Sequence, residues 1–484
     1  MRYGLIGKSL IHSYSKEIHE ALGRYDYGLY SLSADEMPDF IRAGDFGGLN
    51  VTIPYKKDVM ALCGEISDLA RDIGAVNTLY WKEASGCAGS ADRAADAPSS
   101  QGDRILVGHN TDYEGFLYAA KRAGISFAGK TVLILGTGGT SLTARKAVSD
   151  SGAAMIYIAS RRAAGAAEKN STTDHASVHA DCTSCGIDQA IPCASDMSGS
   201  ASCSPPCPIC QLTYAELHGI AGSVQVIVNT TPVGTYPNNL QSVIDISDFP
   251  NCESVIDVIY NPFKTKLLLE AEKTGIRFSN GLPMLVAQAT AAAGYFLGTP
   301  GAFEPENERI IADMERRMNN IVLIGMPGSG KSTIGRLLSE QTGKRFVDMD
   351  QEIETRTGIS IPEIFECFGE KHFRDLESET AFDLGKEHGL VIAAGGGAVL
   401  RPENVDALRQ NGLVIHVTRP ASDLSTDGRP LSKDIDTLRA MEKERMPIYE
   451  AAADLTFDNS ESCSYEELAG RLTARLKNFI STTR

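Results

Sequence analysis

The chain has 484 residues, of which 42% are hydrophobic and 22% charged, a composition typical of globular domains. It carries 62 acidic residues against 46 lysines and arginines, and the net charge of −16 disfavours a partner of nucleic acids or anionic membranes, because such a field repels polyphosphate. No apolar run reaches the roughly 18 residues of a membrane span, and the start MRYGLIG lacks the layout of a signal peptide. We therefore expect a cytoplasmic protein of about three domains. Small anionic substrates stay possible where a few basic side chains are placed to bind them.

Short β-like runs alternate with helical patterns along most of the chain, which is typical of parallel sheets covered by helices. The clearest runs are LNVTIP, TVLILG, MIYIAS, VQVIVN, SVIDVIY, NIVLIG, LVIAAGGG and LVIHVT. Two of them end in glycine-rich turns, near residues 136 and 325, where an α/β domain would bind a phosphate-bearing ligand. The two turns differ in sequence, so the pattern predicts two catalytic units and no internal repeat.

Two stretches interrupt this alternation. Residues 83–104 are small and polar and are predicted to form a surface loop. Residues 163–210 begin rich in alanine and become rich in serine, cysteine and proline, so we expect an insertion without a core of its own. Further on, proline and glycine in 298–307 end an alanine-rich helix, and a charged helix at about 306–317 leads directly into the second unit. We therefore do not expect the two units to tumble independently.

The first glycine-rich turn, Gly136–Thr140, would let the backbone approach a pyrophosphate at a helix N-terminus, although a purely structural turn is the alternative. An NAD site would show an acidic residue about 20 positions later, to bind the ribose hydroxyl. This chain shows Ser160, Arg161 and Arg162 instead. Guanidinium groups suit a 2′-phosphate, so the cofactor is predicted to be NADP.

Three polar segments lie ahead of this turn, each at the end of an apolar strand: NVTIPYK, GAVNT and HNTD. Within them Lys56 and Asp112 are candidates for an acid–base pair. Reduction of a carbonyl needs a proton on the oxygen as hydride reaches the carbon, and a lysine held by a carboxylate can supply it. A surface salt bridge is the alternative that the residues alone leave open.

In their order, the motifs of residues 1–318 resemble the shikimate dehydrogenase family, NADP-dependent enzymes that reduce 3-dehydroshikimate. These motifs are IHSYSKEIH, NVTIPYK, GAVNTL, NTD, GTGGT, NTTPVG, DVIYNP and GLPMLVAQA. The resemblance implies a substrate-binding domain at 1–112, completed by helices at about 262–318. It also implies a Rossmann NADP-binding domain at 113–261, which would contain the cysteine-rich insertion.

The same resemblance implies roles for single residues, with Lys56 and Asp112 as the catalytic pair. The substrate carboxylate would contact Ser13 and Ser15, and its hydroxyls and ring would contact Thr52, Asn77, Tyr260 and Gln288. The cofactor would be bound by Gly136, Gly138, Gly139, Ser160, Arg161, Arg162 and Gly281. Asn110 and Gly281 also match positions that line this cleft.

The chain departs from the usual pattern of this family without losing a reacting group. The family usually reads GAGGA where this chain has GTGGT, and NRT where it has SRR, and Pro283 stands where glycine is common. Ser160 in place of asparagine loses an amide contact, while Arg162 adds a second cation for the 2′-phosphate. The insertion at 163–210 is the larger departure, since it begins directly after these arginines.

The second turn, Gly325–Ser332, is a complete phosphate loop between strand NIVLIG and helical segment TIGRLLSEQ. Its backbone amides would cradle phosphates, Lys331 would reach the β- and γ-oxygens, and Ser332 would bind Mg²⁺. The usual acidic end of the Walker-B strand is missing, because LVIAA runs into a glycine triplet. Asp348 and Asp350, at the end of strand RFVDMD, are therefore the candidates for the acidic metal partner.

Arg374, Arg429 and Arg445 are three cations beside strand ends of an acidic chain, which predicts recognition of an anion; solvated helix faces are the alternative. Residues 319–484 resemble the shikimate kinase family through DMDQEIE, FRDLE, AAGGGAV, GRPL and ERMPIYE. The resemblance implies a P-loop kinase domain with a parallel sheet that uses ATP and Mg²⁺.

This second resemblance also implies roles for single residues. Shikimate would be held by Arg374, Arg445, Gly395, Gly396 and Gly397, with Asp350 as the base at its 3-hydroxyl, Glu377 fixing Arg374, and Asp348 placing Mg²⁺. The nucleotide would be bound by Gly328, Ser329, Gly330, Lys331, Ser332, Thr333 and, from the lid, Arg429. The lid segment DLSTDGRPL is short, and Ser425 lies near the place of an arginine often found there. Nucleotide affinity and closure of the lid are the two properties that depend on this departure.

Of the eleven cysteines, Cys63, Cys252, Cys367 and Cys463 are isolated and are expected to be small buried hydrophobic residues. Two C-x₂-C pairs have a spacing close to that of a zinc ribbon: Cys182 with Cys185, and Cys207 with Cys210, with Cys193, Cys203 and His179 nearby. A structural Zn²⁺ clip is one interpretation. A low-complexity loop that has gained cysteines is the other.

Together these observations predict an α/β bifunctional enzyme of the shikimate pathway. It would reduce 3-dehydroshikimate to shikimate with NADPH and then convert shikimate to shikimate 3-phosphate with ATP. A ligand-sensing regulator without turnover is disfavoured, because binding alone needs no acid–base pair such as Lys56 and Asp112. A dehydrogenase that also accepts quinate stays open, and the sequence makes no prediction of the oligomeric state.

Overall fold

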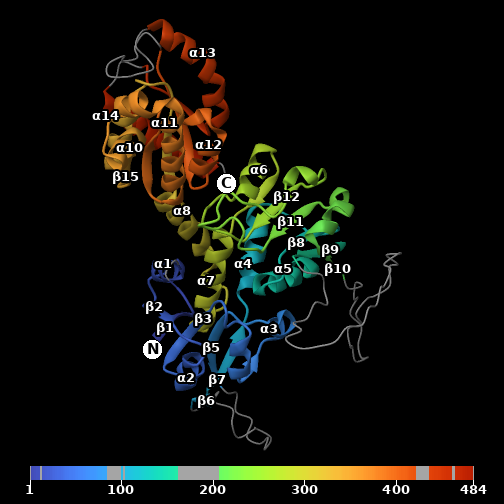
Figure 1. Cartoon of the computed structure of the whole chain (residues 1–484). Helices are drawn as coiled ribbons and strands as arrows, with labels where there is room; N and C mark the ends of the chain where they lie inside the picture. Colours follow the sequence, from blue (N-terminus) through green and yellow to red (C-terminus); the bar gives the residue numbers. More distant parts are fainter. Residues whose placement is uncertain are drawn as a thin grey trace, which may run out of the picture.

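The computed structural model describes residues 2–10, 13–83, 100–101, 104–161, 207–420, 435–460 and 464–482 (Figure 1). In this part of the chain, sheets of seven, six and five strands follow one another along the sequence. Helices lie against each sheet, which confirms the α/β class. No helix among the described residues is both long and apolar enough to cross a bilayer.

The seven-stranded sheet has the order β2-β1-β3-β5-β7-β4, with β6 paired to β7. Its strands are β1 Arg2–Gly7, β2 Tyr27–Ser31, β3 Phe46–Val51, β4 Glu65–Ile66, β5 Thr78–Glu83, β6 Ser100–Gln101 and β7 Arg104–His109. β1 runs parallel to β2 and β3, whereas β5 runs antiparallel to β3 and β7. The sheet is mixed, unlike the parallel sheets that the alternation predicts, because β5 and β7 pair without a crossover helix between them.

The predicted surface loop at 83–104 lies mostly outside the described residues. Its described positions are in strands: Glu83 ends β5, Ser100–Gln101 is β6, and Arg104 begins β7. The prediction of a loop is therefore wrong at both ends of this stretch. Its small and polar composition conceals the β6–β7 pairing, which is antiparallel.

The six-stranded sheet has the order β10-β9-β8-β11-β12-β13, and all its strands are parallel. Its strands are β8 Thr131–Leu135, β9 Met155–Ser160, β10 Ile209–Thr213, β11 Val226–Asn229, β12 Ser254–Asp257 and β13 Arg277–Ser279. Successive residues of β8 point to opposite faces: Val132 and Ile134 pack in one buried cluster, and Leu133 and Leu135 in another. Both faces are therefore covered, as a parallel sheet requires.

The order of strands reverses between β8 and β11, a point where open α/β sheets bind ligands. The turn Gly136–Thr140 leaves β8 at this point. The segment after β11 lies beside it, since the backbone N–H of Thr230 donates to the carbonyl of Leu135 at 2.9 Å. The first glycine-rich turn thus lies where a nucleotide would be expected.

The predicted boundary of the cysteine-rich insertion is wrong at its C-terminal end. Residues 162–206 lie outside the described part of the chain, but Cys207 packs against a buried cluster of the six-stranded sheet, and β10 pairs in parallel with β9. The backbone N–H of Ile156 also donates to the carbonyl of Pro208 at 3.0 Å. Residues 207–210 therefore belong to the sheet, because a parallel edge strand can satisfy its backbone even where proline and cysteine weaken the sequence signal.

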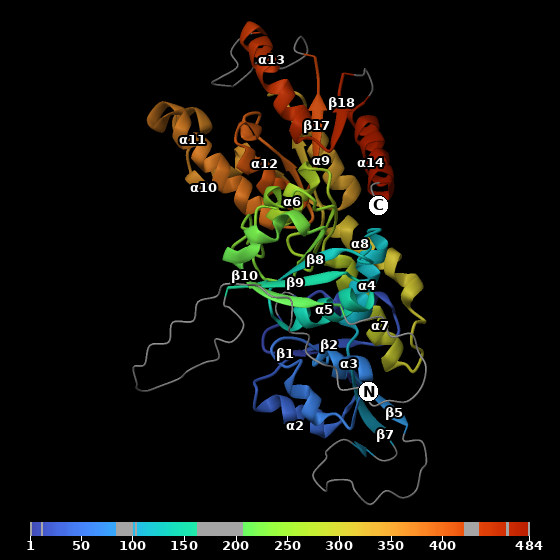
Figure 2. The same cartoon turned by 90° about the vertical axis from the view of Figure 1, so that its right-hand side faces the viewer.

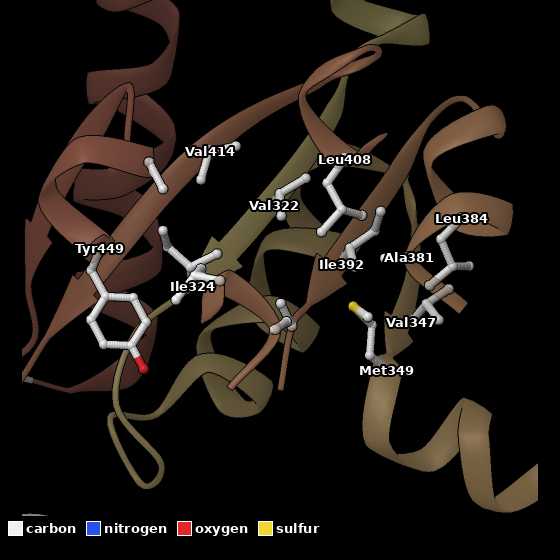
Figure 3. Close-up of a cluster of buried hydrophobic side chains, with 14 of the residues drawn as sticks. Val322, Ile324, Val347, Met349, Ala381, Leu384, Ile392, Leu408, Val414 and Tyr449 are labelled. Atoms are coloured by element: carbon white, nitrogen blue, oxygen red, sulfur yellow. The ribbon is translucent and has the colours of Figure 1, made fainter. Parts of the chain in front are cut away.

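The five-stranded sheet has the order β15-β16-β14-β17-β18 and is also parallel. Its strands are β14 Asn320–Ile324, β15 Arg345–Asp348, β16 Leu390–Ala393, β17 Gly412–Thr418 and β18 Leu455–Asp458. Figure 3 shows the apolar core on one face, where Val322 and Ile324 of β14 lie between Ile392 of β16 and Val414 of β17. The phosphate loop follows β14, the central strand, and therefore lies between the turns after β16 and β17.

The helices that accompany the first two sheets are α1 Ser15–Ala21, α2 Glu36–Ala43, α3 Asp68–Ile73, α4 Asp112–Arg122, α5 Gly139–Asp150, α6 Lys266–Lys273, α7 Leu282–Phe296 and α8 Asn307–Met318. Those of the third sheet are α9 Lys331–Thr342, α10 Met349–Thr357, α11 Ile361–Lys386, α12 Pro402–Arg409, α13 Ile435–Ala452 and α14 Tyr465–Thr482. Short 3₁₀ turns are η1 Asp58–Leu62, η2 Tyr214–Gly219, η3 Ala221–Ser223, η4 Ile246–Asp248, η5 Glu304–Glu306 and η6 Ala398–Leu400.

Helix α8 joins residues 1–318, called the first half below, to residues 319–484, called the second half, as the sequence predicts. It ends at Met318, and β14 begins at Asn320. Lys344, from the second half, donates from Nζ to the carbonyls of Arg316, Arg317 and Asn319 at 2.7, 2.9 and 2.7 Å. This ammonium satisfies carbonyls at the C-terminus of α8 and so fixes the joining helix to the second half. Figures 1 and 2 show α8 between the two halves.

Candidate functional sites

A cavity of about 350 Å³ lies between the seven-stranded and six-stranded sheets. It is lined by side chains from loops after β1 and β3, from α4, from the segment after β12 and from α7. The residues predicted from sequence that line it are Ser13, Ser15, Thr52, Lys56, Asn77, Asp112, Tyr260, Gly281 and Gln288. The structure thus brings together in one cavity the whole predicted substrate set and the predicted acid–base pair.

Lys56 and Asp112 form a close ion pair in the wall of this first cavity. Nζ of Lys56 lies 2.5 Å from Oδ2 of Asp112, and the two side chains are only 16% and 11% exposed, so this is not a surface salt bridge. Asp112 is the first residue of α4, where the helix dipole favours a negative charge. A lysine ammonium has three donors, so Lys56 keeps a proton for a ligand oxygen while Asp112 holds it.

Asn77 binds the carboxylate oxygen of Asp112 that Lys56 does not contact. Its Nδ2 donates to Oδ1 of Asp112 at 2.9 Å, and its Oδ1 accepts the backbone N–H of Thr111 at 2.7 Å. Oε1 of Gln288 lies 3.4 Å from the same Nδ2. Both carboxylate oxygens of Asp112 are therefore engaged, which fixes its orientation in the cavity.

Close packing of α4 and α7 brings the two helices to the same cavity. A Cβ atom on Gly115 would lie 2.5 Å from the carbonyl oxygen of Met284 and 2.9 Å from Cβ of Gln288. No side chain larger than hydrogen fits at this contact. Asp112 at the start of α4 and Gln288 in the middle of α7 therefore meet because of this glycine.

Of two further residues that the resemblance assigns to this cleft, Gly281 lines the cavity and Asn110 does not. Asn110 is fully buried and donates from Nδ2 to the carbonyl of Ala75 at 2.9 Å, and it does not line the cavity. Its side chain therefore joins the segment after β7 to the segment before β5. Gly281, predicted for the cofactor, lines the substrate cavity, where a Cβ atom would lie 2.0 Å from the carbonyl oxygen of Val258.

The glycine-rich turn lies directly beside the first cavity. Gly136 has φ +102°, a conformation that favours glycine, and Gly138 is the N-terminal flanking residue of α5. A Cβ atom on Gly138 would have no neighbour within 4 Å, so the turn is open where a pyrophosphate would lie at the helix N-terminus. A Cβ atom on Gly139 would lie 4.0 Å from Cδ of Lys56, so a ligand on the turn would reach the acid–base pair.

The cationic residues after β9 are only partly described. Ser160 ends β9, Arg161 follows it and is exposed, and Arg162 lies outside the described residues. Thr140, which lines the first cavity, was not singled out from sequence. The sequence feature that could have identified Thr140 is its position in the glycine-rich turn.

A second cavity, of about 410 Å³, opens at the carboxyl ends of the five-stranded sheet. It is lined by the loop after β14, the end of β15, α11, the turn after β16 and α13. The predicted residues that line it are Gly328, Gly330, Lys331, Ser332, Thr333, Asp348, Asp350, Arg374, Glu377, Gly395, Gly396, Gly397 and Arg445.

One end of the second cavity is the phosphate loop. Gly330 has φ +93° and precedes α9, and Nζ of Lys331 donates to the carbonyls of Gly325 and Met326 at 2.9 and 3.0 Å. The hydroxyl of Ser332 donates to Oδ2 of Asp348 at 2.5 Å, so the two predicted Mg²⁺ ligands are already in contact. Two such oxygens suit Mg²⁺, which keeps water and phosphate as its other ligands.

The opposite end carries two buried arginines. Nη1 of Arg374 donates to Oε2 of Glu377 at 2.8 Å, and Nη1 of Arg445 donates to the carbonyl of Gly396 at 3.1 Å. A Cβ atom on Gly397 would lie 2.2 Å from Nη1 of Arg374, so a glycine is needed for the guanidinium to lie against the turn. This end of the cavity is suited to a small carboxylate.

Two carboxylates approach the glycine triplet between these ends. A Cβ atom on Gly395 would lie 2.6 Å from Oε1 of Glu377 and 2.9 Å from Oδ1 of Asp350. Burial raises the pKa of Glu377, although the Arg374 guanidinium opposes this shift. Oε1 of Glu377 and Nε of Arg445 are buried without a hydrogen-bond partner among the described residues, as expected of groups that await a polar ligand.

Not every predicted nucleotide residue is in this second cavity. Ser329 is fully buried below the loop, where its carbonyl accepts from Nδ2 of Asn459 at 2.6 Å, so its side chain faces the protein and not the cavity. Arg429 lies outside the described residues. Arg419 lines the cavity and was missed, although its place directly after strand LVIHVT was a usable signal.

The predicted zinc clip falls largely outside the described residues, because Cys182, Cys185, Cys193 and Cys203 precede residue 207. Among the residues that the structure describes, no group of three metal-ligating side chains occurs. Cys207 and Cys210 are placed by the six-stranded sheet, as described above. The clip stays a prediction, to be tested by metal analysis of protein purified without added zinc, with about one equivalent expected.

Comparisons with known proteins find two families. The family model described as shikimate dehydrogenase substrate binding domain matches residues 5–79, and the one described as shikimate kinase matches residues 327–477. The chain is similar to the shikimate kinase of Chromobacterium violaceum, with 40% identity over 171 residues, 34% of this chain and 92% of the relative. It is 44% identical to that of Clostridium beijerinckii over 146 residues, 29% of this chain and 86% of the relative.

The chain is also similar to solved structures. Shikimate dehydrogenase 1 from Peptoclostridium difficile is 28% identical, and the match covers 65% of this chain and 98% of that structure with a TM-score of 0.48.

Proposed function

The chain belongs to the shikimate kinase family through its second half and carries a shikimate dehydrogenase unit in its first, and we propose that it catalyses two successive reactions. In the first cavity it reduces 3-dehydroshikimate to shikimate with NADPH. In the second it transfers a phosphoryl group from ATP to the 3-hydroxyl of shikimate. This proposal divides the chain into three domains. The substrate-binding domain is 1–112, completed by helices at about 262–318. The NADP-binding domain is 113–261, and the kinase domain is 319–484. We place both reactions in the cytoplasm, where NADPH and ATP are available.

NADPH supplies the hydride of the reduction. Lys56 donates a proton to the ketone oxygen as negative charge develops there, and Asp112 keeps the ammonium in place. Ser13 and Ser15 bind the carboxylate of the substrate, and Asn77, Tyr260 and Gln288 surround its hydroxyls and ring. The observation that carries this assignment is that a Cβ atom built on Gly139 would lie 4.0 Å from Cδ of Lys56, which supports a cofactor on this turn close to the proton donor.

The glycine-rich turn fits the pyrophosphate, and Arg161 with Arg162 would bind the 2′-phosphate of NADP. No carboxylate stands at Ser160–Arg162, where one would favour NAD. NADPH is therefore the expected cofactor, and the enzyme should use NADH much less efficiently.

ATP supplies the phosphoryl group of the second reaction, with Mg²⁺ on its phosphates. Lys331 and the loop amides hold the phosphates, and Ser332 with Asp348 binds the metal. Arg374 and Arg445 bind the carboxylate of shikimate, which turns the 3-hydroxyl toward Asp350. Asp350 accepts the hydroxyl proton, and the remaining residues act by orientation and by neutralising charge.

Two separate assays test the proposal. Oxidation of shikimate with NADP⁺ should produce NADPH, and shikimate with ATP and Mg²⁺ should produce ADP. Failure of the first assay with an active second would contradict the dehydrogenase assignment alone. Failure of both, with ligands still bound, would support a sensor without turnover.

A further inference from the structure

The turn between α12 and β17, residues Gln410 and Asn411, lies in the second half of the chain but contacts the first half. The two residues are 0% and 1% exposed, although both are polar. They contact the segment Asn261–Lys264, which connects β12 with α6. Figure 2 shows α12 and α6 side by side where the two halves meet.

This turn satisfies the backbone of the first half. Oδ1 of Asn411 accepts a hydrogen bond from the backbone N–H of Phe263 at 2.9 Å. The backbone carbonyl of Gln410 accepts a hydrogen bond from the backbone N–H of Lys264, also at 2.9 Å. Nε2 of Gln410 donates back to the carbonyl of Lys264 at 3.4 Å. A buried amide without a partner is costly, so these backbone groups depend on the second half of the chain for their conformation.

The same two side chains also bind Tyr236 and Asn239 of the first half and the carbonyl of Gly385 in the second. Nδ2 of Asn411 donates to the hydroxyl of Tyr236 at 2.8 Å and to the carbonyl of Gly385 at 3.0 Å. Nδ2 of Asn239 donates to Oε1 of Gln410 at 2.7 Å. Both donors of the Asn411 amide are therefore used, and the contact is a satisfied buried network.

The other end of the contacted segment reaches the first cavity. Tyr260, which lines that cavity, immediately precedes Asn261. Oδ1 of Asn261 lies 3.0 Å from Nε2 of His388, a residue of the second half. Phe263 is buried in the apolar cluster against which Tyr260 packs. A displacement of Phe263 would therefore reach the cavity wall within three residues.

We propose that Asn411 and Gln410 are positioning residues for the reduction of 3-dehydroshikimate. They fix the segment that carries Tyr260, so the substrate cavity of the first half is complete only in the joined chain. The inference rests on the proposed dehydrogenase activity and adds to it that the kinase half contributes to the substrate site. The hydrogen bonds of Gln410 and Asn411 among the described residues do not include the glycine-rich turn Gly136–Thr140, so we expect the KM for NADPH to change less than the KM for 3-dehydroshikimate.

The test compares variants of the full chain in steady-state kinetics. Asn411→Ala should raise KM for 3-dehydroshikimate about tenfold, while KM for NADPH and kcat/KM of the kinase stay within about twofold of the original values. Tyr236→Phe removes one hydroxyl of the network from the first half and should raise the same KM by about threefold. If Asn411→Ala does not fold, the KM of Tyr236→Phe for 3-dehydroshikimate tests the proposal instead.

Lys273→Ala is the matched control, because Lys273 and Asp406 form an exposed ion pair across the same contact at 2.7 Å. It should leave every parameter unchanged. The inference is overturned if both test variants fold and keep KM for 3-dehydroshikimate within about twofold of the original, or if KM for NADPH rises equally. If the unaltered chain reduces no 3-dehydroshikimate but phosphorylates shikimate, the proposed dehydrogenase function itself fails, and the inference with it.

Discussion

The two cavities of this chain are built in different ways. The second lies at the strand ends of one parallel sheet, and its phosphate loop is continuous in sequence from Gly325 to Ser332. The first lies between two sheets and combines residues from Leu5 to Gln288. A local motif is therefore enough to predict the phosphate-binding end of the second cavity, whereas the whole of the first depends on helix packing and on segments far apart in the chain.

The largest expected effects are those of variants that abolish the reaction of one cavity and leave the reaction of the other unchanged. Lys56→Ala should lower kcat/KM for reduction about 10³-fold and leave phosphorylation unchanged, because it removes the proton donor. Lys331→Ala should lower phosphorylation at least about 10²-fold and leave reduction unchanged, because it removes charge from the phosphates. Both activities are measured on each purified variant. Loss of both activities in either variant, with the fold intact, would contradict two independent sites.

A smaller change tests the close approach in the second cavity. Gly397→Ala places a Cβ atom where Nη1 of Arg374 lies, at 2.2 Å, and the guanidinium would have to move. We expect kcat/KM for shikimate in the kinase reaction to fall about 10²-fold with reduction unchanged. Gly470→Ala is the control, because Gly470 is exposed on helix α14 and a Cβ atom there would have no neighbour within 4 Å. Normal kinase activity of Gly397→Ala would argue against Arg374 as the carboxylate ligand.

Helix packing at the first cavity can be tested in the same way. Gly115→Ala forces a Cβ atom against the carbonyl of Met284 at 2.5 Å, so α4 and α7 must separate. We expect a loss of about 1–3 kcal/mol of stability, together with weaker substrate binding in the reduction. Thermal unfolding and steady-state kinetics measure the two effects. Gly222→Ala, which meets no atom within 4 Å, should change neither, and an equal loss in both variants would refute the packing argument.

The last expected effect is a dependence of stability on pH. Asp257 is fully buried and accepts hydrogen bonds from Asn229, Ile259 and Thr265, and burial raises its pKa from 3.8 to about 6. Because the folded pKa lies above the unfolded value, its contribution to stability is present below about pH 4 and is lost as pH rises through 6. Relative to Asp257→Asn, the original chain should lose up to about 2–3 kcal/mol between pH 4 and 7.

Thermal midpoints of the two proteins across this pH range measure the difference. A constant difference would show that Asp257 titrates at its ordinary pKa.

Much of this arrangement follows from the sequence because the strands are apolar and end in diagnostic turns. All eight runs singled out from the sequence correspond to strands, β3, β8, β9, β11, β12, β14, β16 and β17. What escaped prediction has physical reasons. β10 lies at a sheet edge and has a weak apolar pattern, and β5 is half polar, with Lys82 and Glu83 exposed. Their pairing depends on partners far away in the chain.

The same limit applies to the sites. Residues in continuous motifs, such as Lys331 and Ser332, lie where expected. Ser329 belongs to the same motif but turns inward, because only the backbone of a phosphate loop needs to face its ligand. The contact of Asn411 with Phe263 had no sequence signal, since polar residues in a turn are ordinary until a second unit buries them.

The most direct test of two successive reactions is one incubation of the full chain with 3-dehydroshikimate, NADPH, ATP and Mg²⁺, followed by mass spectrometry. The account predicts shikimate 3-phosphate as the end product, with shikimate as a transient intermediate. Recovery of unchanged 3-dehydroshikimate would contradict it.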